Sequence, residues 1–243
     1  MNNRSFRVDD NSINSFIPSY SGTKGSIATH SNLSATTAYS ILNNDKGNAF
    51  DAAAGAMLVE SLVNPQMFGM GGEGVMILKP SFSKNPIVLN GNTRSPIDFN
   101  FLNLVTRGHR EVPDQGILCA GVPSAFSSII RLLQNYGNLE FRIIAKYALK
   151  YAKDGFPIHS GIVNQKKFGL KELEEKFLTD WKNSKNLYLK GNDIPKIGSL
   201  FKNKPFAELL DYLSNYEKKL IGNRKTNFNK LHDAFYKGDI SDI

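Results

Sequence analysis

The sequence contains a single cysteine, a single tryptophan and four histidines among its 243 residues. One cysteine excludes an intrachain disulfide framework and any zinc site that is built on paired cysteines. Cys119 lies in the apolar stretch GILCAGVP. We expect it to be a buried small apolar residue and not a nucleophile, because no histidine is placed by the sequence to activate it. Neither a metal site nor a cofactor site is predicted.

Long apolar runs are also missing from the sequence. The longest mostly apolar run, Ala49 to Val59, contains Asp51 and is much shorter than the ~20 residues that a helix needs to cross a bilayer. The first stretch, MNNRSFRVDDNSINSFIPSYSG, lacks the apolar region of a secretory signal. We therefore expect a cytoplasmic protein with no membrane partner.

Acidic residues are outnumbered, because 30 lysines and arginines face 22 aspartates and glutamates, for a net charge of +8. Such a balance favours contact with anions but identifies no partner by itself. The sequence has no aromatic RNA-binding motif, no Cys/His finger and no basic stripe along a helix face. We therefore expect a solvated basic surface and no nucleic-acid partner.

Composition and hydrophobic pattern predict the division of the chain and its first two elements. Residues 1–24 are polar and predict an irregular N-terminal arm, whereas residues 25–243 predict one continuous domain portion. The alternation in GSIATHS, residues 25–31, predicts a short strand. The following SNLSATTAYSILNN predicts a helix that is capped by Ser31 or Asn32.

The most informative stretch is GNAFDAAAGAMLVESLVNPQMFGMGGEG, residues 47–74. Asn48 is a good N-cap, and Asp51 in the first turn meets the free amide groups and the positive end of a helix. The residues that follow are apolar on all sides, which is typical of a buried helix, and many are small enough for close approach of a neighbour. Asn64 and Pro65 end the predicted helix.

The glycines after this helix match a nucleotide-binding spacing. Gly69, Gly71 and Gly74 fit G-x-G-x-x-G, but that fingerprint needs a strand before the glycines and a helix after them. Here a helix precedes them and the predicted strand GVMIL follows. We therefore interpret Gly69, Gly71, Gly72 and Gly74 as a turn whose glycines permit positive φ and close backbone approach.

The remaining elements follow from periodicity and from helix stop signals. GVMIL and PIVLNGNTRSP predict an antiparallel hairpin. The next segment predicts two helices, with Pro123 in the first turn of one and with Gly137 and Gly155 as their ends. The C-terminal third, from about residue 164, is helical in pattern with a polar interruption at residues 222–230.

Four segments, taken in order, resemble the gamma-glutamyltransferase family. GNAFDAAAGAMLVESLVNPQMFGMGGEGVMIL is similar to the family's Gly-Asn-Ala-x-Asp-Ala-Ala helix, its proline and its Gly-x-Gly-Gly turn into a strand. GVPSAF resembles a Val-Pro-Gly helix start, and YGNLEFRIIAKYALKYAKDGFPI resembles a Tyr-Gly-x-Leu helix with its Gly-Phe-Pro close. AFYKGDI resembles an Ala-Phe-Tyr-x-Gly-x-Ile motif. The four motifs lie in this order within residues 25–240 of the chain.

The resemblance implies an α/β (α+β) fold, the four-layer αββα sandwich of the N-terminal nucleophile hydrolases, of which this chain would be the first half only. It also implies a proenzyme that cuts itself in two, so that a new N-terminal threonine of the small subunit becomes the nucleophile. The α-amino group of that threonine is then the base, since its pKa near 8 leaves it partly neutral at neutral pH. Water or an amino acid acceptor attacks the acyl-enzyme.

The sequence departs from the family pattern in two places. It stops at Ile243, before the expected nucleophile, so we expect no catalytic residue in this chain and a small-subunit-like chain or missing half as its partner. In LNGNTRSP, Asn92 stands where the family arginine would hold the α-carboxylate of a γ-glutamyl group. Arg94 is two residues further, about 6.5 Å along the same strand face. This form is similar to a divergent, acylase-like branch, so Asn92 and Arg94 are the candidate substrate-binding residues.

Two hypotheses about function remain open. In the first, the chain is the large-subunit-like portion of an enzyme that acts on γ-glutamyl or glutaryl-type small molecules. In the second, it is a non-catalytic remnant or binding module that keeps half of the fold. Half a sandwich is expected to leave a sheet face and an apolar helix uncovered.

Overall fold

The structure, a computed structural model, describes residues 25–114, 116–189 and 191–241. The predicted N-terminal arm, residues 1–24, lies outside the described residues. The helices are α1 (Asn32–Asn43), α2 (Ala49–Val63), α3 (Phe101–Thr106), α4 (Ala125–Tyr136), α5 (Phe141–Asp154), α6 (Ser160–Asn164), α7 (Glu174–Thr179), α8 (Lys182–Tyr188), α9 (Lys204–Lys218) and α10 (Arg224–Tyr236), with a 3-10 turn η1 (Ile117–Cys119). The strands are β1 (Met76–Leu78), β2 (Ile87–Leu89), β3 (Phe156–Pro157) and β4 (Leu200–Phe201).

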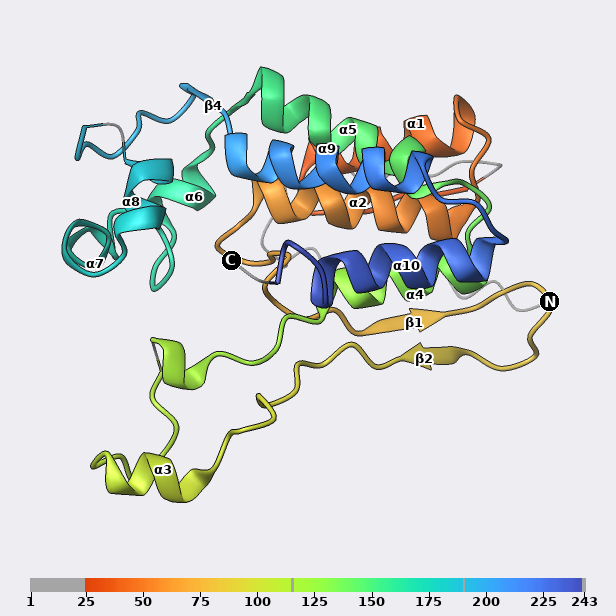
Figure 1. The fold of residues 1–243 in the computed structure, drawn as a ribbon. Coiled ribbons are helices and arrows are strands. Elements are labelled where there is room, and N and C mark those ends of the chain that lie inside the picture. The colour runs from red at the N-terminus through yellow and green to blue at the C-terminus, as the bar shows by residue number, and fades with distance from the viewer. Residues whose placement is uncertain (1–24, 115, 190, 242–243) are drawn as a thin grey trace, which may run out of the picture.

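Helix α2 is the centre of the core, as its apolar sequence predicts. It packs against α1, α4 and α5, while α9 covers α5 and α10 covers α4. Figure 1 shows these long helices gathered on one side of the β1–β2 hairpin. Gly55 lies in the interface of α1 and α2, and a Cβ at this position would overlap the side chain of Ile41. The absence of a side chain at Gly55 therefore permits the close contact of the two helices.

Asp51 joins the start of α2 to a distant turn. It is fully buried and forms a capping box with Asn48, whose backbone N–H donates to Asp51 Oδ2 at 2.9 Å. The same carboxylate accepts the N–H groups of Asn138 at 3.0 Å and Leu139 at 3.2 Å, in the turn between α4 and α5. The predicted cap at Asn48 and Asp51 is confirmed, and Asp51 also fixes the relative position of three helices.

The β1–β2 hairpin has the predicted antiparallel pairing but leaves one face open. Ile77 pairs with Val88 in the register of the two strands. The side chains of Val75, Ile77 and Val88 are exposed by 54%, 77% and 62%. The expectation of an uncovered sheet face is therefore confirmed. The apolar helix that is left uncovered is α3, in which Phe101, Leu102 and Val105 are exposed, and not α2, which is enclosed by its neighbours.

A long excursion between β2 and α4 projects from this body of helices and carries α3 and η1 (Figure 1). Its apolar side chains include Ile97 and Ile117, which are exposed by 99% and 86%. Cys119 is also exposed. The prediction of a buried cysteine is therefore wrong, because the apolar neighbours of Cys119 in sequence belong to a segment that has no core around it.

Three local predictions need correction. Residues 25–31 form no strand, since none of the described residues forms a β-ladder with this backbone. Pro123 precedes α4 and is not part of its first turn, because Ser124 is the N-cap. The segment 222–230 is only partly an interruption: Asn223 caps α10, which begins at Arg224. The predicted ends of α4 and α5, at Gly137 and Gly155, are confirmed.

Glu217 of α9 caps the N-terminus of α5 from outside that helix. Its carboxylate is buried and accepts the N–H groups of Phe141 at 2.9 Å and Arg142 at 2.8 Å. Burial raises the pKa of Glu217 above its ordinary value of 4.5, and the two backbone donors offset only part of this shift. A carboxyl group whose pKa is raised on folding adds stability below the unfolded pKa and loses it as the pH rises through the folded pKa.

We therefore predict that the wild-type chain gains stability over Glu217→Gln as the pH falls from 7 to below about 4.5, the ordinary carboxyl range. Urea unfolding of both proteins across this range measures the difference. The matched control is Glu208→Gln, an exposed glutamate of the same helix, whose difference from wild type is expected to change little with pH. A difference in the free energy of unfolding between wild type and Glu217→Gln that stays constant with pH contradicts the prediction.

Candidate functional site

The turn of Gly69 to Gly74 lies between α2 and β1, which is the order of elements that the sequence predicts and that the nucleotide fingerprint does not have. The carbonyl oxygen of Gly72 accepts the N–H groups of Ser124 and Ala125, both at 2.9 Å, at the start of α4. Ser124 Oγ donates to the carbonyl oxygen of Gly91 at 2.6 Å. The glycine turn, the end of the hairpin and the start of α4 therefore form one connected unit.

The prediction for the four glycines, positive φ and close approach, is confirmed only in part, because close approach is found at Gly72 and Gly74. The described glycines with positive φ are elsewhere, so positive φ at Gly69, Gly71, Gly72 and Gly74 is wrong. A Cβ on Gly69 or Gly71 would meet open space, whereas a Cβ on Gly74 would lie 3.2 Å from Met57 Cε. Close approach is thus needed at Gly74 but not at the first two glycines.

The glycine with the tightest surroundings is Gly91, which the sequence patterns did not single out. The backbone N–H of Gly74 donates a hydrogen bond to the carbonyl oxygen of Gly91 at 3.0 Å. A Cβ on Gly91 would overlap both Ser128 Oγ and the Gly74 carbonyl oxygen. The one sequence signal that could have identified Gly91 is its position at the end of the predicted strand segment PIVLNG, directly before Asn92.

Asn92 and Arg94 lie on an exposed edge that follows this contact. The backbone N–H of the intervening Thr93 donates to Glu73 Oε2 at 3.0 Å. On the other side, the N–H of Val122 donates to the carbonyl oxygen of Arg94 at 2.8 Å in an isolated antiparallel bridge. The structure therefore brings the predicted turn and the predicted substrate-binding residues together, through Glu73, which the sequence patterns did not identify.

Arg94 is suited to bind an anion. Its side chain is exposed, and no hydrogen bond or ion pair within residues 25–114, 116–189 and 191–241 engages the guanidinium group. A guanidinium group keeps its charge at every physiological pH and matches a carboxylate with two parallel donors. Asn92, also exposed, offers an amide that donates and accepts hydrogen bonds but carries no charge.

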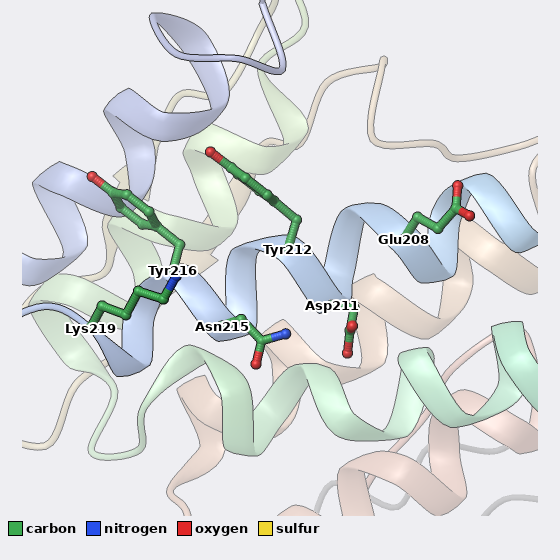
Figure 2. Close-up of a pocket in the computed structure, with 6 residues that line it drawn as sticks. All are labelled: Glu208, Asp211, Tyr212, Asn215, Tyr216 and Lys219. Atoms are coloured by element: carbon green, nitrogen blue, oxygen red, sulfur yellow. The ribbon is translucent and has the colours of Figure 1, made fainter.

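A pocket of about 320 Å³ lies on α9 and contains none of these residues. Figure 2 shows its lining side chains, which come from this helix and from its C-cap residue: Glu208, Asp211, Tyr212, Asn215, Tyr216 and Lys219. Its carboxylates already have partners, because Lys153 lies 3.4 Å from Asp211 and Lys204 lies 3.6 Å from Glu208. We therefore assign no substrate to this pocket.

Across the part of the chain that the structure describes, no three or more His, Cys, Asp or Glu side chains are grouped as metal ligands. Within the same residues, no helix has both the length and the apolar character to cross a bilayer.

Most of the chain is similar in sequence to one protein family and to curated relatives. Residues 34–243 match the family described as Gamma-glutamyltranspeptidase. The chain is similar to the glutathione hydrolase-like YwrD proenzyme of Bacillus subtilis, with 28% identity over 221 residues that cover 90% of this chain and 38% of the relative. The chain thus spans well under half the length of that curated relative.

Two solved structures share the fold. The gamma-glutamyltranspeptidase of Helicobacter pylori superposes with a TM-score of 0.75 at 22% identity, over 93% of this chain and 60% of that chain. The cephalosporin acylase of Bacillus halodurans superposes with a TM-score of 0.74 at 22% identity, over 86% of this chain and 36% of that chain. These likenesses confirm the predicted α/β class of N-terminal nucleophile hydrolase type, of which the chain covers a part.

Proposed function

Because the chain belongs to the gamma-glutamyltranspeptidase family, we propose that it is the large-subunit-like portion of an enzyme that transfers or hydrolyses γ-glutamyl or related acyl groups. The observation that carries this proposal is the family match over residues 34–243, together with the connection of the glycine turn to the edge of Asn92 and Arg94. Residues 25–243 would form one portion of the catalytic domain. A cytoplasmic location remains a prediction from the sequence.

In this proposal, the exposed edge forms one wall of the acyl-donor site. Arg94 binds a carboxylate of the donor by two parallel hydrogen bonds, and Asn92 lies beside it as an uncharged partner. The threonine nucleophile and the oxyanion donors come from a small-subunit-like chain. A donor carboxylate that binds Arg94 is displaced along the chain from one that would bind at position 92. We therefore propose that the site accepts a glutaryl-type donor as well as a γ-glutamyl donor. The similarity in fold to a cephalosporin acylase supports this wider donor range.

Coexpression tests the proposal. The chain is produced with the small-subunit half of the Bacillus subtilis relative, and cleavage of γ-glutamyl and glutaryl anilides is measured. We expect activity from the copurified complex and none from either half alone. Failure of a stable, copurified complex to cleave either anilide would overturn the enzymatic proposal.

The exposed β1–β2 face favours a second candidate function. Val75, Ile77 and Val88 form a continuous apolar surface of a kind that marks association, and a binding module without catalysis would use it in the same way as a subunit would. A complex that forms stably but lacks activity, while the same half is active with its own large subunit, supports this alternative.

We predict that Arg94→Ala raises the KM of the assembled enzyme by about 10- to 100-fold, because charged hydrogen bonds to the donor carboxylate are lost. The kcat is expected to change less, since the guanidinium group binds a part of the substrate that does not react. Steady-state kinetics with both anilides measures the effect. Arg110→Ala, an exposed arginine of the excursion, is the control with unchanged KM, and an equal effect of both substitutions contradicts the assignment.

A further inference from the structure

Four polar side chains meet where α4 packs against α10, two helices that lie side by side in Figure 1. Ser127 Oγ lies 3.0 Å from His232 Nε2, and His232 Nδ1 lies 3.5 Å from Asp233 Oδ1. The backbone N–H of Ser127 donates to the hydroxyl oxygen of Tyr236 at 3.0 Å. The order serine, imidazole, carboxylate is that of an activated nucleophile and its base.

The imidazole has the correct protonation state for a base. Burial lowers the pKa of His232, whose side chain is 19% exposed, so the ring is neutral at neutral pH. Burial pushes the pKa of Asp233 up, but the hydrogen bonds from Lys237 and His232 outweigh it and hold that pKa below its ordinary value. The ionised carboxylate next to Nδ1 keeps the ring proton on that nitrogen. His232 Nε2 is then free to accept the hydroxyl proton of Ser127.

Ser127 lies at the start of α4, where its backbone N–H binds the Tyr236 hydroxyl group. Ser127 is the third residue of α4, so its backbone N–H has no acceptor within the helix and it lies at the positive end of the helix dipole. Tyr236 accepts that N–H through its oxygen, and no described residue accepts the hydroxyl hydrogen of Tyr236. Burial raises the pKa of Tyr236, which keeps this hydrogen in place. Tyr236 therefore holds a free donor beside the serine hydroxyl.

We propose that Ser127, His232, Asp233 and Tyr236 form a nucleophilic site that is acylated by small activated carboxylic esters. Ser127 Oγ attacks the ester carbonyl carbon while His232 Nε2 takes the hydroxyl proton. The oxyanion that forms accepts a hydrogen bond from the Tyr236 hydroxyl group. The carbon–oxygen bond to the leaving alcohol then breaks, the alcohol takes the proton from His232, and the acyl group stays on Ser127. In a second step, water attacks the acyl carbon while His232 Nε2 takes its proton. The bond to Ser127 Oγ then breaks, Oγ takes the proton from His232, and the carboxylic acid is released.

The size of the substrate follows from burial. Ser127 and His232 are only partly exposed, and the ring of Tyr236 lies 4.5 Å from that of His232. With both groups half-buried, we expect an acetyl ester to reach the serine hydroxyl more easily than a bulky acyl group. A purely structural role, in which the serine and the imidazole only join α4 to α10, is the competing explanation.

The test uses the purified 243-residue chain with a small fluorophosphonate probe, followed by intact-mass and peptide mass spectrometry. We expect one label per chain, on Ser127, and no label on the neighbouring Ser124 and Ser128, which hydrogen-bond to backbone carbonyl groups. Ser127→Ala removes the label. His232→Gln slows labelling by about 100-fold or more, because the general base is lost. Ser128→Ala is the control, with an unchanged labelling rate.

A second measurement separates catalysis from packing. Tyr236→Phe keeps the ring but removes both the hydroxyl donor and the acceptor of the Ser127 N–H. We expect it to slow acylation by p-nitrophenyl acetate by about 100-fold with only a small loss of thermal stability. Absence of selective labelling of Ser127 in the wild-type chain overturns the proposal without any variant. Labelling that is independent of His232 in a folded variant also overturns it and leaves only the structural role.

Discussion

Replacement of Asp51 by alanine is expected to destabilise the chain by about 3 kcal/mol, because loss of an N-cap partner costs about 1 kcal/mol and partly buried donors without an acceptor add to it. Three backbone N–H groups, those of Asn48, Asn138 and Leu139, lose their acceptor in this variant. Urea unfolding, followed by circular dichroism, measures the free energy of unfolding.

The matched control for this change is Asp154→Ala, because Asp154 is an exposed aspartate at the end of α5. We expect its effect to stay within about 0.5 kcal/mol. Asp51→Asn keeps one acceptor oxygen and is expected to fall between the two alanine variants. If Asp51→Ala is no less stable than Asp154→Ala, Asp51 does not hold the turn between α4 and α5 as described.

Replacement of Gly91 by alanine is expected to destabilise the chain by about 1–3 kcal/mol, because the added methyl group has no room. It would overlap Ser128 Oγ and the backbone of Gly74, and the backbone cannot rotate away as a side chain can. The hydrogen bond from Gly74 to Gly91 must then open, which moves the edge of Asn92 and Arg94 away from the glycine turn. In the assembled enzyme, we therefore also expect a raised KM.

Gly71→Ala is the matched control for Gly91→Ala. A Cβ at Gly71 meets nothing within 4 Å, and its φ lies outside the left-handed region, so its effect is expected to stay within about 0.5 kcal/mol. Ser128→Ala combined with Gly91→Ala relieves only one of the two overlaps and is expected to restore part of the lost stability. Equal stability of the Gly71→Ala and Gly91→Ala variants contradicts the close contact.

Features that depend on neighbouring residues in sequence were predicted well. The bounds of α2 follow from the cap at Asn48 and the stop at Asn64, and both residues directly flank the helix in sequence. The hairpin of β1 and β2 and the ends of α4 and α5 follow from equally local signals. The role of Asp51 in the distant turn could not be read in the same way, because its partners come from another part of the chain.

The predictions that failed depend on what surrounds a segment. Residues 25–31 alternate like a strand but have no strand partner among the described residues. Cys119 has apolar neighbours in sequence but none of the core around it. For the candidate site, the sequence pattern drew attention to the Gly69–Gly74 turn, but the glycine under the tightest steric limit is Gly91, since that limit is set by Gly74 and Ser128 across the fold.

The bridge between Arg94 and Val122 has a consequence for how the chain tolerates insertions. It ties together the two ends of the excursion that carries α3 and η1. The entropy of closing a flexible loop grows with the logarithm of its length, so that doubling the length costs only about 0.6 kcal/mol. Residues added to or removed from the excursion leave the bridge, and with it the orientation of Arg94, in place. A change in the length of the excursion is therefore expected to have little effect on the free energy of unfolding. This tolerance lies directly beside the edge that is proposed to bind substrate.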